Sequence, residues 1–200
     1  MNRICWSISA VVVGMTCLAF FAFQCLAQDT TSPKTDGIPD FVTYHRVTLN
    51  LAGAELIVAA AKTKAAELRV NENIAVVDDG GHLIAFARMD KARPASISTA
   101  LTKAAAAATT RQATGPVRRG DAEPDLLLNL SLQNAAALNG GKMTGLLGGV
   151  PIVVDGQVIG AVGVGGGTGE QDAEVAKAGI EHLLKQLGSS DVRGTNSSQK

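Results

Sequence analysis

A run of glycines is the feature of this sequence that most invites a chemical role. Gly165, Gly166 and Gly167 are followed by Thr168, and Asp172 lies five residues after the last glycine. A glycine turn at the start of a helix can hold a nucleotide phosphate on free backbone N–H groups. The dinucleotide-binding spacing fails here, because position 168 is threonine where the third glycine is needed. Two interpretations remain: the glycines permit close backbone packing while Asp172 complements the helix dipole, or these residues line a pocket.

Three further charged side chains are candidates for binding an acidic ligand. Arg88 and Asp90 are two positions apart, which places them on the same face of an extended strand. They form a local ion pair on an exposed face, or Arg88 binds a carboxylate if that face is concave. Lys103 lies in an alanine-rich segment and is either a solvated lysine or a second carboxylate-binding cation.

The histidines argue against a zinc site. No two of His45, His82 and His182 are three or four residues apart, so the sequence has no zinc-binding signature and we predict no metal ligands. We expect His82 to be solvated in a turn and His182 to be structural. His45 precedes the first helix and is our candidate for an axial haem ligand. Because the chain has no Gly-x-Ser-x-Gly motif, we assign no catalytic residue.

Residues 1–27 have the pattern of a secretory signal peptide. Arg3 gives a basic start, an apolar run extends from Ile4 to Phe23, and Cys25-Leu26-Ala27 resembles a cleavage site. Cleavage near Ala27 would yield a secreted or periplasmic protein with no membrane segment. The alternative is an uncleaved membrane anchor, since the apolar run is long enough to span a bilayer.

The composition of the remaining chain excludes several classes of function. All three cysteines lie before residue 28, so the processed chain would have neither a disulfide nor a cysteine metal ligand. Removing Arg3 from a chain of 18 basic and 18 acidic residues leaves one net negative charge. The sequence therefore offers no basic surplus for binding nucleic acid.

Hydrophobic periodicity predicts the helices and strands that must position these residues. We predict a flexible linker over 28–42, one domain over 43–188 and a disordered tail over 189–200. Helices are predicted from residue 51, from about 96 and from 169 to Gly188, and a short helix, with a strand as the alternative, after residue 125. Strands are predicted over 73–78, 83–90, 143–147, 150–154 and 157–164. Asp155-Gly156 predicts a type I′ hairpin turn, and Thr168 with Gln171 predicts a capping box.

This order of elements predicts an α+β domain in which helices flank a mainly antiparallel, five-stranded sheet. Its hairpins and glycine turn also carry a resemblance. The segments concerned are Val76–Leu83, Arg88–Asp90, Lys103-Ala104, Gly148–Ile152, Val158–Gly167, Asp172 and Ala178-Gly179. In that order they resemble the GlcG/HbpS haem-binding family, which includes the C-terminal domain of PduO, and the resemblance covers about 47–187.

The resemblance implies a profilin-like fold, a homo-oligomer and haem as the cofactor, with haem breakdown or iron release in some members. Arg88, Asp90, Lys103, Gly165–Gly167 and Asp172 match positions that recur in the family. Our leading hypothesis is an exported haem-binding protein that promotes oxidative haem degradation or iron release, with His45 as axial ligand and Arg88 near the propionates. The alternatives are a non-catalytic small-ligand-binding or sensory accessory protein, and an enzyme acting on a small carboxylated metabolite.

Overall fold

The structure is a computed structural model that describes residues 46–194, except positions 119, 121, 139 and 141. The predicted signal peptide, the linker and His45 lie outside the described residues. The elements in chain order are α2 (Leu51–Glu67), β1 (Asn73–Asp78), β2 (Leu83–Arg88), α3 (Ser96–Thr110), α4 (Leu126–Leu138), β3 (Gly149–Val154), β4 (Gln157–Gly165) and α5 (Gly169–Gly194).

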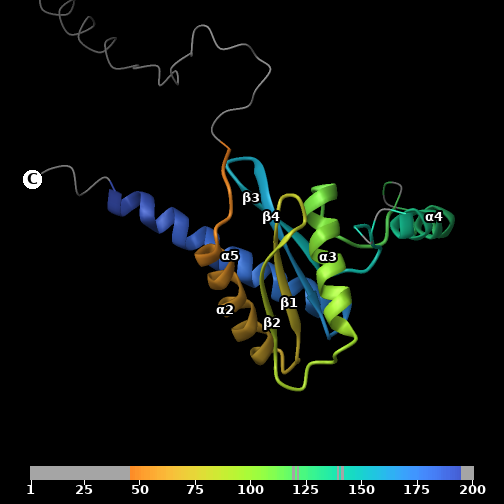
Figure 1. Ribbon diagram of the computed structural model, residues 1–200, viewed down its shortest axis with the longest axis horizontal. Coiled ribbons are helices and arrows are strands. Elements are labelled where there is room, and N and C mark those ends of the chain that lie inside the picture. The colour runs from red at the N-terminus through yellow and green to blue at the C-terminus, as the bar shows by residue number, and fades with distance from the viewer. Residues whose placement is uncertain (1–45, 119, 121, 139, 141, 195–200) are drawn as a thin grey trace, which may run out of the picture. The chain divides into compact units, whose positions relative to one another are not determined.

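The fold is a helix–sheet–helix sandwich of the α+β class. The four strands are antiparallel in the order β2-β1-β4-β3. Helix α3 packs on one face of the sheet, and α2 and α5 pack together on the other (Figure 1). The α2–α5 side is filled by branched residues such as Ile57, Ile74 and Val162. The α3 side is built almost entirely from alanine and valine, so this helix lies close to the strands.

The hairpin β3–β4 and its connection to α5 confirm the strongest local predictions. Asp155 and Gly156 both have positive φ, 50° and 72°, and connect the paired residues Val154 and Gln157, as a type I′ turn requires. The capping box is complete: the Thr168 N–H donates to Gln171 Oε1 at 2.9 Å, and the Gln171 N–H donates to Thr168 Oγ1 at 3.3 Å.

The prediction of a fifth strand over 143–147 is wrong, because this segment is irregular and the sheet has four strands. It would have had to extend the sheet beyond β3, where Pro151 has no N–H to donate to a neighbouring strand. Leu147 instead packs over Gly115 and Gly169, so the segment covers the start of α5.

Helix α4 differs from the other helices in its burial, and α5 ends later than predicted. The stretch after residue 125 forms a helix, α4, that buries none of its residues. Helix α5 continues to Gly194 although the sequence predicts its end at Gly188; Gly188 does not take a left-handed φ and does not end the helix. Within the described part of the chain, no helix combines the length and apolar character needed to cross a membrane.

Candidate functional site

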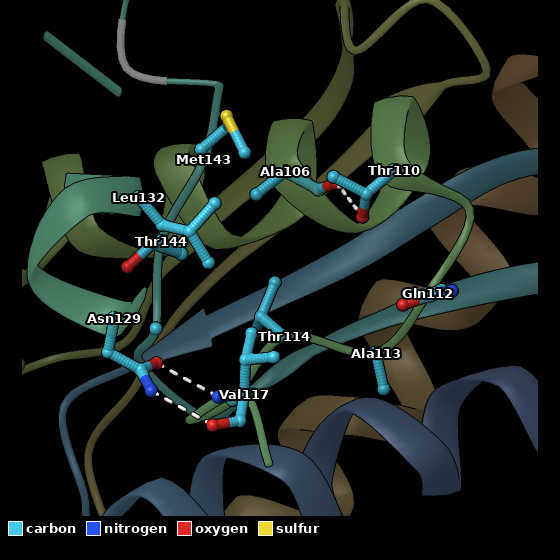
Figure 2. A pocket seen from close by; sticks show the side chains of 12 residues that line it. Ala106, Thr110, Gln112, Ala113, Thr114, Val117, Asn129, Leu132, Met143 and Thr144 are labelled. Carbon is cyan, nitrogen blue, oxygen red and sulfur yellow. Dashed lines mark hydrogen bonds between the residues drawn. The ribbon is translucent and has the colours of Figure 1, made fainter. Parts of the chain in front are cut away.

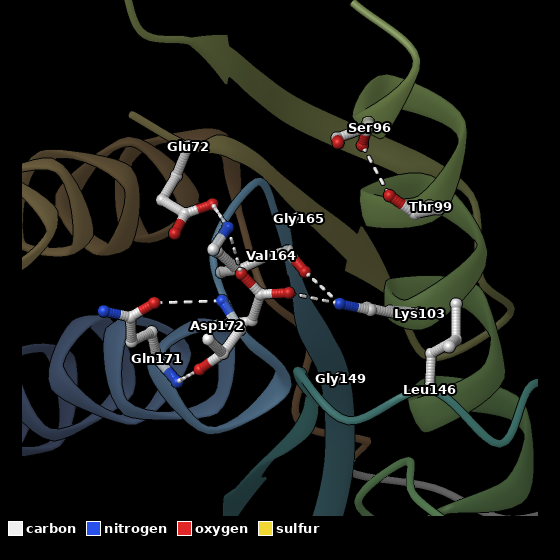
Figure 3. A network of polar contacts seen from close by, with 12 residues as sticks. Glu72, Ser96, Thr99, Lys103, Leu146, Gly149, Val164, Gly165, Gln171 and Asp172 are labelled. Carbon is white, nitrogen blue, oxygen red and sulfur yellow. Dashed lines mark hydrogen bonds and ion pairs between the residues drawn. The ribbon is translucent and has the colours of Figure 1, made fainter. Parts of the chain in front are cut away.

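A polar cleft of about 210 Å³ lies where the N-terminal half of α3 meets the loop between β4 and α5. Its lining combines charged and hydroxyl side chains with glycines and two leucines. Figure 3 shows several of them, among them Thr99, Lys103 and Asp172. The residues are Arg93, Ser96, Thr99, Lys103, Leu146, Leu147, Gly166, Gly167, Gly169 and Asp172.

A buried ion pair forms the centre of this cleft. Lys103 Nζ donates to Asp172 Oδ2 at 2.5 Å and to the Val164 carbonyl oxygen at 2.9 Å. The Lys103 and Asp172 side chains are only 5% and 3% exposed. Removing two charges from water carries a large desolvation cost, which this pair offsets only through its short contacts and additional hydrogen bonds. The other Asp172 oxygen accepts from the Gly167 N–H at 3.0 Å, so both of its oxygens are bonded.

Small residues on facing elements explain why Lys103 can reach Asp172. A Cβ added at Gly163 would strike the Ala100 carbonyl oxygen and the Ala104 backbone nitrogen. Helix α3 therefore approaches β4 more closely than any larger residue would permit. At this separation, the side chain of Lys103 extends across the end of β4 to the first turn of α5, as Figure 3 shows.

Glu72 is a member of this network that sequence reasoning missed. It precedes β1, is fully buried, and accepts from the Gly167 N–H through Oε2 at 3.0 Å. Its Oε1 has no hydrogen-bond partner among the described residues. Burial and then the Asp172 carboxylate raise the pKa of Glu72 from 4.5 to about 7, against the opposing effects of the Gly167 N–H and Lys103. The only signal in the sequence is an acidic residue directly before a buried strand.

The structure brings together five of the eight residues proposed from the sequence. Lys103, Gly166, Gly167 and Asp172 line the cleft, and Gly165 packs beside it against Thr99 and Ser96 of α3. Lys103 is therefore not the solvated lysine of the simpler interpretation.

The other proposed residues lie elsewhere. Arg88 is exposed, and its Nε donates to the Ala92 carbonyl at 3.3 Å. Asp90 is exposed beyond the end of β2, and neither residue lines the cleft. His45 lies outside the described residues.

His82 is exposed as predicted but has a partner. Its ring Nδ1 lies 3.2 Å from Asp78 Oδ2, and its backbone N–H donates to Asp78 Oδ1 at 2.8 Å. Partial burial opposes ionisation of Asp78, but these contacts and the Gly80 N–H together lower its pKa. This arrangement stabilises the β1–β2 turn. Among the described residues there is no cluster of three or more His, Cys, Asp or Glu side chains suited to a metal ion.

Two further hollows differ in character from the cleft. An apolar groove of about 390 Å³ lies between the segment before α2, the C-terminal half of α5 and the β3–β4 hairpin; its walls include Val47, Leu49, Leu56, Val154, Ile159, Leu183 and Leu187. A pocket of about 200 Å³ lies between α3, α4 and residues 143–145, and Met143 and Leu132 line it (Figure 2). Asn129 fixes its rim by bonding both backbone groups of Val117 at 2.9 Å.

Comparisons with known proteins point in one direction. A family model described as "Haem degrading protein HbpS-like" matches residues 49–181. Protein GlcG of Escherichia coli strain K12 is 43% identical over 119 residues, which cover 60% of this chain and 82% of GlcG. The crystal structure of Klebsiella pneumoniae ORFY superposes with a TM-score of 0.60 at 31% identity, covering 72% of this chain and 96% of ORFY. The crystal structure of a PduOC:Heme complex gives a TM-score of 0.57 at 28% identity, covering 68% and 95%.

Proposed function

Because the chain belongs to the HbpS-like family, we propose that it is a haem-binding protein whose apolar groove holds the porphyrin. Haem binding requires an apolar slot and an axial ligand, and cations near the propionates strengthen it; none of the described residues that line the groove is Lys or Arg. The groove, at about 390 Å³, lies within the size range of ligand pockets, and most of its walls are aliphatic. The polar cleft, at about 210 Å³, lies below that range and has an ion pair at its centre. The observation that carries the proposal is this apolar groove in a member of the family.

The side chains that line the groove support an axial ligand from outside this lining. None of the described residues that line the groove is His, Met, Tyr or Cys. His45 lies two positions before Val47, which lines the groove, and outside the described residues. We therefore assign the axial ligand to His45. The iron of bound haem would supply the redox chemistry, and the protein's own contribution is the apolar wall and the ligand.

Three finer features belong to the same proposal. Residues 1–27 would act as a cleaved leader, so that the processed protein meets haem outside the cytoplasm. The protein would form homo-oligomers, which is consistent with the four exposed leucines of α4: Leu126, Leu127, Leu130 and Leu138. Finally, bound haem would undergo oxidative breakdown or release its iron.

A hemin titration of the processed protein tests the binding proposal. We expect a sharp, saturable Soret shift, and we expect His45→Ala to weaken binding at least about tenfold or to change the spectrum. Met143→Ala, in the pocket beside α4, and His82→Ala are matched controls that should leave the titration unchanged. Absence of a saturable shift in the wild type would remove the haem proposal. An unchanged shift in His45→Ala would remove the ligand assignment alone.

Haem degradation is tested in a separate assay. Loss of the Soret band on addition of ascorbate, with catalase present to remove free peroxide, would identify breakdown of haem. A stable band under those conditions would identify a carrier.

A further inference from the structure

The polar cleft and the apolar groove lie at different positions along α5. Asp172 lies in the first turn of the helix, while Leu183 and Leu187 line the groove. At a rise of 1.5 Å per residue, the cleft and the groove are about 20 Å apart along the helix. A porphyrin in the groove would therefore leave the cleft unused.

The cleft carries more donor capacity than the protein itself uses. Lys103 has three N–H donors, of which one bonds Val164 O and one bonds Asp172. Arg93 also lines the cleft; its Nε donates to Ser96 Oγ at 3.0 Å, and among the described residues it has no carboxylate partner. Two cations and one carboxylate give the residues that line the cleft one net positive charge.

The shape and the remaining charges of the cleft restrict the anion it can take. Its volume of about 210 Å³ suits a molecule of a few carbon atoms. Leu146 and Leu147 give it an apolar wall. Two carboxylates, those of Glu170 and Asp172, lie in the first turn of α5, and the Gly167 N–H is already bonded to Asp172 and Glu72. These negative charges oppose a dianion such as phosphate more strongly than a monoanion.

We propose that this cleft binds a short-chain monocarboxylate, with its carboxylate between the Arg93 guanidinium and the third Lys103 N–H and its carbon chain against Leu146 and Leu147. The planar guanidinium offers paired donors that match a carboxylate, and the ammonium adds a point charge. Binding at this site requires no haem, so the carboxylate-binding proposal is tested independently of the haem proposal.

The test uses the processed protein without haem and follows binding of acetate, butyrate and lactate by isothermal titration and by backbone amide shifts in NMR. Lys103 is left unchanged, because removing it would leave Asp172 charged and unpaired in buried surroundings. Arg93→Gln removes the exposed cation of the cleft, and Arg88→Gln makes the same substitution at an exposed arginine outside it. Inorganic phosphate serves as the competing anion.

We expect saturable binding of at least one of the three acids, with the largest amide shifts at Gly166, Gly167 and Gly169. Arg93→Gln should weaken binding at least about tenfold, as loss of a charge-assisted pair does, and Arg88→Gln less than twofold. The proposal is overturned if none of the acids saturates, if phosphate binds as tightly as the acids, or if both variants weaken binding equally. A hemin titration of Arg93→Gln that matches the wild type would confirm that the groove is separate.

Discussion

Replacing Glu72 with glutamine should remove a large part of the pH dependence of folding stability between pH 4.5 and 7. The carboxyl of Glu72 is fully buried beside Asp172, and its pKa is raised from 4.5 to about 7. In the unfolded chain the same carboxyl would release its proton near pH 4.5. Folding therefore takes up a proton between those two values, and the stability of the wild type falls as the pH rises through that interval.

The size of the effect follows from the two pKa values. The rise in the pKa of Glu72 from 4.5 to about 7 corresponds to about 3 kcal/mol of folding stability, which is fully present below pH 4.5 and lost above pH 7. For a domain of this size, that is a change in Tm of roughly 10 °C. Glutamine keeps the shape of the side chain and an oxygen to accept from the Gly167 N–H at the position of Oε2. Its amide N–H can donate to Asp172, as the protonated carboxyl would.

Urea unfolding of the wild type and of Glu72→Gln at pH 5 and pH 8 measures this difference directly. The variant should be close to the wild type at pH 5 and more stable by up to about 3 kcal/mol at pH 8. Glu55→Gln, at an exposed position on α2, is the matched control and should follow the wild type at both pH values. If Glu72→Gln and the wild type lose the same stability between pH 5 and pH 8, Glu72 does not hold its proton in the folded state and the reasoning fails.

Two further perturbations test the packing and the surface. Gly163→Ala should lower the free energy of unfolding by at least about 2 kcal/mol, because the new Cβ would strike the Ala100 carbonyl oxygen. Gly188→Ala meets nothing within 4 Å and should stabilise α5 by about 0.5–1 kcal/mol. Thermal unfolding of both variants measures the two effects. The double variant Leu127→Glu, Leu130→Glu should sediment as a monomer if α4 forms the oligomer interface, while Leu83→Glu, on β2 and about as exposed as Leu130, should keep the wild-type mass.

The elements that sequence reasoning placed correctly are those specified by local chemistry. The Asp155-Gly156 turn needs two residues that tolerate positive φ, and the capping box needs only Thr168 and Gln171 at the right spacing. The strands on either side follow from their β-branched runs. Such features depend on residues a few positions apart, and one sequence is enough to predict them.

Features set by distant contacts were not predicted. Residues 143–147 have the apolar pattern of a strand, but whether they pair depends on the partner edge, where Pro151 lacks a donor. Glu72 has the pattern of an ordinary surface acid; in the structure it is buried and accepts from the N–H of Gly167, 95 positions further along. The ion pair of Lys103 and Asp172 likewise joins residues 69 positions apart.

The glycines of β4 connect these observations. Close packing and a pocket role are alternatives in the sequence, yet in the structure one causes the other. Gly163 and Gly165 lie two apart on a strand and thus on one face, opposite Ala100 of α3, and their missing side chains let the helix approach. This close approach lets the Lys103 side chain extend past the end of β4 to Asp172. A buried lysine at this position needs a carboxylate partner, and α5 supplies it. A β-strand with glycines at alternate positions, facing an alanine-lined helix that carries one lysine, should therefore predict a buried ion pair at the following helix N-terminus.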